Sequence, residues 1–130
     1  LPLLTADDTL VVLALAQTLT NKRVTAMVVS ATSITTSVAI NADITDIHVV
    51  TAQAEAILYS NPTGTLTQGQ KLIIRIKDNA TARAITWGAN FRAMGTALPT
   101  TTVASKTKYL GFMYNSTDTR WDLLAAADEA

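Results

Sequence analysis

The stretch Lys71-Leu72-Ile73-Ile74-Arg75-Ile76-Lys77 carries the clearest alternation of apolar and basic residues in this chain. Every second residue from Leu72 to Ile76 falls on one side of an extended backbone, and the three basic residues fall on the other side. The pattern therefore predicts a strand with one buried face and one face toward solvent. Turn-forming residues follow at 78–81, so residues 82–87 are expected to return beside this strand as its hairpin partner.

Beyond this stretch, short β-rich runs continue from Val24 to the C-terminal end, separated by Asn, Asp, Gly, Pro and Ser. Many short strands with turn residues between them are typical of an all-β fold, and we expect a jelly-roll-like antiparallel β-sandwich of about eight strands. The predicted strands lie near residues 24–30, 34–40, 47–52, 56–60, 71–77, 82–87, 108–115 and 120–125.

The N-terminal residues 1–23 differ in character from residues 24–130, which we expect to form the sandwich domain. Thr5, with two carboxylates shortly after it, is a suitable helix cap. The pattern favours a short helix from about residue 6 to 17. Apolar residues lie nearly all round this helix, so we expect it to be buried on several sides. The run Leu10 to Ala16 is also compatible with a buried strand, because so short a run has no decisive periodicity.

The composition indicates a chain that associates. Hydrophobic residues make up 48% of the chain and charged residues 15%, against about 25% charged residues in ordinary soluble domains. The formal net charge is zero, so bulk charge favours neither nucleic acid nor an anionic membrane as a partner. The longest apolar run, Leu10 to Ala16, is far shorter than the ~20 residues that span a bilayer, so no membrane insertion is expected.

Few residues offer catalytic or metal-binding chemistry. The chain has no cysteine and one histidine, His48, which we expect at the solvent or at a subunit interface. The aspartate pairs fit turns and helix caps, where backbone hydrogen bonds favour Asp without a catalytic role. Asn41, Asp43 and Asp46 form a loose oxygen cluster that lacks the spacing of a known calcium loop. We therefore predict no enzyme activity, no cofactor and no metal.

Apolar and aromatic residues suggest two kinds of contact surface. The run Tyr109 to Tyr114 is apolar or aromatic on both faces of the strand, so both faces should be covered, which indicates an obligate oligomer. The alternative is a central strand beneath a long loop. Large aromatic residues at strand ends are more often part of the core than of a site. As candidates for stacking on a glycan we name Trp87, Tyr114 and Trp121.

Five blocks of residues stand in a characteristic order along the chain. They are Leu19 to Val24, Gly69 to Asn79, Thr81 to Gly88, Leu98 to Val103, and Gly111 to Asn115 followed by Trp121. This ordered series resembles the C-terminal domain of tailed-bacteriophage tail fibre and minor structural proteins. The chain departs from that pattern at Asn79-Ala80, where such domains often have Asn-Gly, and at Ile47-His48, where an aromatic residue is common.

The resemblance implies a homotrimeric virion protein without enzyme activity, whose β-sandwich tip contacts a host-surface glycan or protein. Such proteins attach to other virion proteins through a longer N-terminal part, in keeping with a chain that starts at Leu1 without an initiator Met. The helix would surround the threefold axis of the trimer. The expected interface residues are Leu10, Leu13, Leu15, Leu19, Phe112 and Tyr114.

Three other functions stay open at this point. A head fibre protein that decorates the capsid would share the trimer and lack a receptor role. A carbohydrate-binding module of a secreted enzyme would keep the sandwich, work as a monomer and place at least two exposed aromatic residues on one face. An esterase or glycosidase that uses Asp118 and Asp122 is the weakest alternative.

Overall fold

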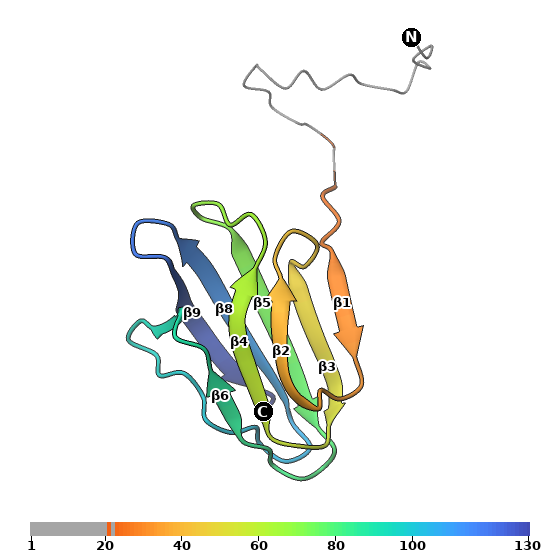
Figure 1. Ribbon diagram of the computed structural model, residues 1–130. Helices are drawn as coiled ribbons and strands as arrows, with labels where there is room; N and C mark the ends of the chain where they lie inside the picture. The colour runs from red at the N-terminus through yellow and green to blue at the C-terminus, as the bar shows by residue number, and fades with distance from the viewer. Residues whose placement is uncertain (1–20, 22) are drawn as a thin grey trace.

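In the computed structural model, residues 21 and 23–130 are described, and they form an all-β fold without a helix (Figure 1). Each of the predicted strands overlaps an observed one, and one short strand, β7, was not predicted. The predicted helix and the expected interface residues Leu10, Leu13, Leu15 and Leu19 lie outside the described residues. The strands are β1 (Val28–Ala31), β2 (Thr36–Asn41), β3 (Ile47–Gln53), β4 (Ile57–Thr63), β5 (Lys71–Asp78), β6 (Ile85–Trp87), β7 (Phe91–Ala93), β8 (Thr107–Asn115) and β9 (Arg120–Asp128).

The strands form two sheets that pack face to face (Figure 1). The six-stranded sheet has the order β1-β3-β5-β8-β9-β7, and the three-stranded sheet has the order β2-β4-β6. From β1 to β6 the chain alternates between the sheets, and neighbours within each sheet run parallel, so this part winds like a flattened coil. β8 then pairs antiparallel with both β5 and β9, and β7 lies parallel to β9 at the edge.

The expected antiparallel, jelly-roll-like pairing was wrong for most of the fold. Five of the seven strand pairings are parallel, whereas a jelly roll is built from antiparallel strands. The hairpin prediction was wrong as well, because β5 pairs with β8 and β6 lies in the other sheet. At the end of β5, the buried Asp78 carboxylate accepts hydrogen bonds from the backbone N–H of Ala80 (3.0 Å) and of Ser105 (2.8 Å). These bonds hold a turn that leads across the sandwich instead of back along β5.

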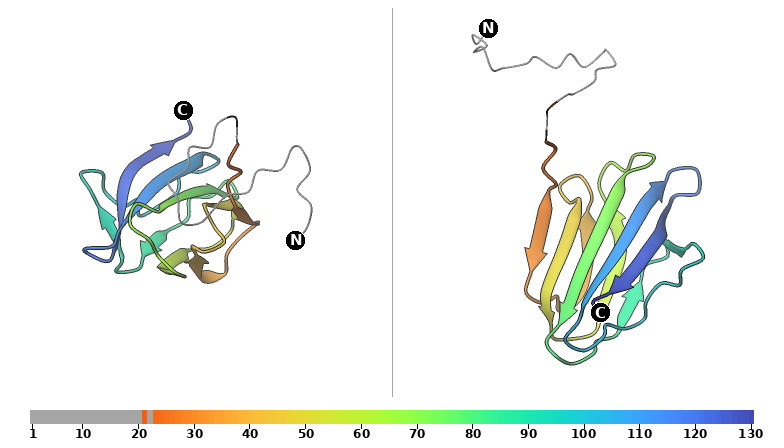
Figure 2. Two further views of the ribbon diagram at one scale, coloured as in Figure 1. Left: turned by 90° about the horizontal axis from the view of Figure 1, so that it is seen from above. Right: turned by 180° about the vertical axis from the view of Figure 1, so that it is seen from behind.

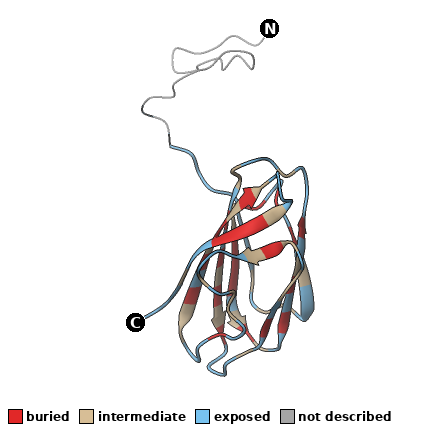
Figure 3. Ribbon diagram, turned by 90° about the vertical axis from the view of Figure 1, so that its left-hand side faces the viewer, coloured by how far each residue is buried: buried red, intermediate tan, exposed pale blue. Residues whose placement is uncertain are grey.

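One core fills the space between the sheets. The predicted inward face of β5 is confirmed, since Leu72, Ile74 and Ile76 are 0% exposed, and Figure 3 shows buried positions alternating with others along the strands. The ring of Trp87 stacks on Tyr59, with 5.0 Å between the ring centroids. Further buried apolar residues come from both sheets: Ile40, Ile57 and Ile85 on one side, and Leu110, Phe112, Tyr114, Trp121 and Leu123 on the other.

His48 points into this core, which contradicts the expectation of an exposed or interface histidine. It is 3% exposed, and its ring meets the ring of Tyr59 edge-on, with 5.8 Å between the centroids. Its Nδ1 has no hydrogen-bond partner among the described residues. Burial disfavours the charged form of an imidazole and lowers the pKa of His48 from its ordinary value of 6.5.

We expect the protein to lose stability as the pH falls below 6.5, the ordinary pKa of His48. The unfolded chain takes up a proton at His48 in this range, whereas the folded chain resists protonation down to its lower pKa, so acid favours unfolding. One such group lowers the free energy of unfolding by at most about 1.4 kcal/mol per pH unit. Urea unfolding of the wild type and of His48→Gln at about pH 7.5 and about pH 5.5 checks this. An equal decline in both proteins would assign the effect to other groups.

Candidate functional site

The predicted glycan contacts lie in the core. Trp121 is 0% exposed and Tyr114 is 6% exposed, so neither ring has a free face for a sugar, and these two predictions were wrong. Trp87 is half-buried, its ring is stacked on Tyr59, and its Nε1 donates to the carbonyl oxygen of Pro99 (2.7 Å). These three residues therefore form no stacking platform.

β8 does have two apolar faces, but the expected interface residues on it lie on the inward one. Phe112 and Tyr114 belong to the core of the sandwich, at 2% and 6% exposed. Strand alternation places Tyr109, Gly111 and Met113 on the opposite side. If the chain associates through this sheet, these outward residues are the ones available to a partner.

The outward side of the six-stranded sheet is called here the outer face. In the right-hand view of Figure 2 this sheet faces the viewer, and no other described strand lies in front of it. One continuous row crosses five strands and consists of Val28, Ile47, Ile73, Gly111 and Ala125. Large apolar side chains are exposed on this face at Val28 (54%), Ile73 (38%), Tyr109 (47%) and Leu124 (56%). An apolar group of this kind on one face is typical of an interaction site.

Charges of opposite sign flank the outer face. Lys71, Arg75 and Lys77 project from β5, and none of them forms an ion pair within the part of the chain that the structure describes. On the far side, Asp122 lies on β9, and Glu129 follows the end of that strand. A shallow hollow of about 460 Å³ lies between the two sides, with Arg75, Lys77 and Glu129 in its lining.

A polar cluster lies at the end of the outer face where β8 turns into β9. Arg92 donates to both carboxylate oxygens of Asp122 (2.7 and 3.0 Å) and to Asp118 (3.0 Å). The guanidinium holds the pKa of Asp122 below its usual range, and the two carboxylates raise the pKa of Arg92. Asp122 therefore stays ionised, whereas a general acid needs a raised pKa. This geometry braces the turn and gives no support to an acid–base pair.

Beside this cluster lies a hollow of about 440 Å³, called here the turn hollow. Its lining includes Gln68, Asn115, Thr117 and Asp118. Asn115 donates from its side chain to Asp118 (3.1 Å), and the oxygen of the Gln68 side chain accepts hydrogen bonds from the backbone N–H and the hydroxyl of Ser116 (2.7 and 2.8 Å). These contacts hold amide and carboxylate groups at the rim of the sandwich.

The oxygen cluster considered for calcium supports the backbone instead. The side-chain oxygen of Asn41 accepts from the N–H of Asp43 (3.0 Å), Asp43 accepts from Thr65 (2.7 Å) and Asp46 accepts from Met27 (2.7 Å). Among the described residues, no group of three or more His, Cys, Asp or Glu side chains could hold a metal ion.

Comparisons with protein-family models, with curated proteins and with solved structures found no match for this chain. A search of residues 21 and 23–130 for a helix long and apolar enough to cross a membrane also found none. The outer face and the turn hollow are thus the features from which a function can be argued.

Proposed function

We propose that this chain is a structural protein of a bacteriophage virion, namely the C-terminal domain of a trimeric tail fibre or spike. The observation that carries the proposal is the outer face, where four exposed large apolar side chains share one side of an all-β sandwich. Such a face is covered when copies of a chain assemble. The ordered blocks from Leu19 to Trp121, which resemble those of phage fibre proteins, favour the virion as the location.

In this proposal the rim of the turn hollow, outside the face that meets other copies, contacts a glycan or protein on the host surface. Loops at one end of a rigid sandwich commonly carry binding residues. Gln68, Asn115 and Asp118 line the hollow with amide and carboxylate groups, which pair with sugar hydroxyls. An N-terminal part of the protein anchors the fibre to other virion proteins.

The remaining alternatives differ from this proposal in assembly or in location. A monomeric carbohydrate-binding module would present at least two aromatic rings on one face, but of the Trp and Tyr residues that the structure describes only Tyr109 is exposed. A head fibre protein would assemble in the same way but decorate the capsid. Antibody labelling of intact particles under the electron microscope distinguishes the head from the tail.

We expect this chain of 13.8 kDa to form particles of three copies in solution. Assembly covers the apolar outer face and removes it from water, so the trimer should persist on dilution to micromolar concentrations. Sedimentation velocity over a range of concentrations measures the mass directly. A stable monomer throughout this range would contradict the fibre proposal and would favour the carbohydrate-binding module instead.

A further inference from the structure

We propose that the outer face is the surface through which copies of this chain assemble, centred on Gly111, with the β5 side of one copy over the β9 side of its neighbour. The inference rests on the self-assembly in the proposed function and names the surface that carries it. Three independent features of the outer face support it.

The first feature is a glycine in the middle of the outer face. Gly111 lies in the middle of the nine-residue strand β8, where glycine is less favourable than alanine because it loses more conformational freedom on folding. Its φ is not positive, and a Cβ added there would meet no atom within 4 Å. By contrast, a Cβ at Gly88 would collide with Asn61. A glycine inside a strand often marks a bulge or a place where another backbone approaches closely. The register of β8 and β9 shifts beside Gly111, and the space outside this glycine is open to a neighbouring backbone.

The second feature is the apolar surface around that glycine. Gly111 lies between Ile73 and Ala125 in the row that crosses five strands, and Tyr109 is exposed two residues away on the same strand. Five strands and the length of β8 give a face of about 20 by 30 Å, or roughly 600 Å² per copy. An area of this size reaches the lower end of stable protein interfaces, which bury about 600–1,000 Å² per partner.

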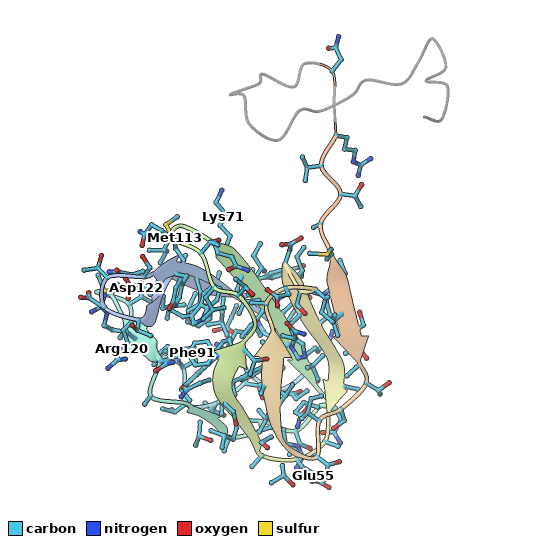
Figure 4. All side chains as sticks on the ribbon, turned by 45° about the horizontal axis from the view of Figure 1, so that its top comes forward. Glu55, Lys71, Phe91, Met113, Arg120 and Asp122 are labelled. Carbon is cyan, nitrogen blue, oxygen red and sulfur yellow. The ribbon has the colours of Figure 1, made fainter. Side chains whose placement is uncertain are left out.

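The third feature is the distribution of charge, which indicates that the partner on the outer face is a second copy of this chain. Lys71, Met113 and Asp122 form one row across β5, β8 and β9 (Figure 4). At the opposite end of the face, Lys77 pairs with Thr107 in register, and the Glu129 carboxylate accepts from the N–H of Thr107 (2.9 Å). Each end of the face thus has a cation on the β5 side and a carboxylate on the β9 side.

Rotation about an axis parallel to β8 brings the β5 side of one copy over the β9 side of the next. Lys77 then faces Glu129 of another copy, and Lys71 approaches the exposed Asp118, which shares Arg92 with the buried Asp122. The opposite arrangement, β5 over β5, would place like charges together and is disfavoured. Since the net charge of the chain is zero, no long-range repulsion opposes the approach of copies.

The test compares arginine at two positions of the outer face with arginine at a control position on the other sheet. Gly111→Arg adds its side chain to open space in a single copy, so the fold should be kept, but it blocks the close approach of copies. We expect its dissociation constant to rise at least 100-fold in sedimentation velocity, with an unchanged far-ultraviolet circular dichroism spectrum. Leu124→Arg, on the same face, should act in the same direction. The matched control is Ala39→Arg on the exposed side of the three-stranded sheet, which should leave assembly unchanged.

The outcomes separate this inference from the proposed function. If the wild type and both outer-face variants assemble equally well as trimers, copies meet through another surface and the inference fails. The fibre proposal then loses the support of the outer face and rests on the trimeric mass and on the ordered blocks from Leu19 to Trp121. If Ala39→Arg alone disrupts assembly, the three-stranded sheet is the interface and the inference fails as well. If the wild type is a monomer, both fail.

Discussion

Replacing Trp121 with alanine is expected to lower the free energy of unfolding by about 3–5 kcal/mol. The side chain is 0% exposed and pairs in register with Phe91 on one side and Tyr114 on the other. Its ring centroid lies 5.2 Å from that of Tyr114. Alanine would leave a large apolar cavity at the place where β7, β8 and β9 meet, and such a cavity costs both the burial of the ring and its contacts with neighbours.

Urea unfolding measures this change, with Leu58→Ala on β4 of the three-stranded sheet as the matched control. Leu58 is 36% exposed and lies away from the outer face, so its truncation should change the free energy of unfolding much less, by about 1 kcal/mol or less. All variants are compared at one chain concentration, because assembly would add a concentration-dependent term. A loss below about 1 kcal/mol for Trp121→Ala would show that the ring is not part of the core and would restore it as a candidate ligand contact.

The sequence predicted where the strands lie better than how they pair. Period-two alternation defines the inward side of β5 correctly, because burying Leu72, Ile74 and Ile76 on one face is a local property of the strand. The choice of neighbour is not local. β5 pairs with β8 over residues 71–77, and the turn after it is held in part by a hydrogen bond from Ser105 to Asp78, which is 27 residues away along the chain.

The predictions that placed site residues on the wrong side of their strands failed for a common reason. Both faces of β8 are apolar, so alternation alone could not distinguish the inward Phe112 from the outward Gly111 and Tyr109. His48 is similar, since it stands among apolar residues and the sequence does not reveal which side of β3 faces the core. β7 is three residues long, which leaves no room for an alternating pattern, and it is defined only by its pairing with β9.

Replacing Gln53 with alanine is expected to lower the free energy of unfolding by about 2–4 kcal/mol. Gln53 is 0% exposed at the end of β3. Its side-chain oxygen accepts from the N–H of Ile34 (2.9 Å), and its Nε2 donates to the carbonyl oxygens of Ile34 (2.7 Å) and Glu55 (2.9 Å). The amide therefore joins the link between β1 and β2 to the link between β3 and β4. Alanine would leave these three backbone groups without their partners at the point where successive turns of the parallel coil meet.

Gln53→Glu tests whether the loss arises from these hydrogen bonds or from the cavity alone. A glutamate of nearly the same size still accepts from Ile34, but once ionised it has no proton to donate to the two carbonyl oxygens. Burial raises the pKa of such a carboxyl group above its unfolded value, so its protonated form fits the folded chain better, and the stability of the variant falls as the pH rises through the folded pKa. The deficit relative to the wild type, measured by urea unfolding at each pH so that the His48 contribution cancels, should thus be large at about pH 7.5 and smaller at about pH 5. An equal deficit at both pH values would mean that donation to the carbonyl oxygens does not hold the crossovers together, and that packing around the side chain does.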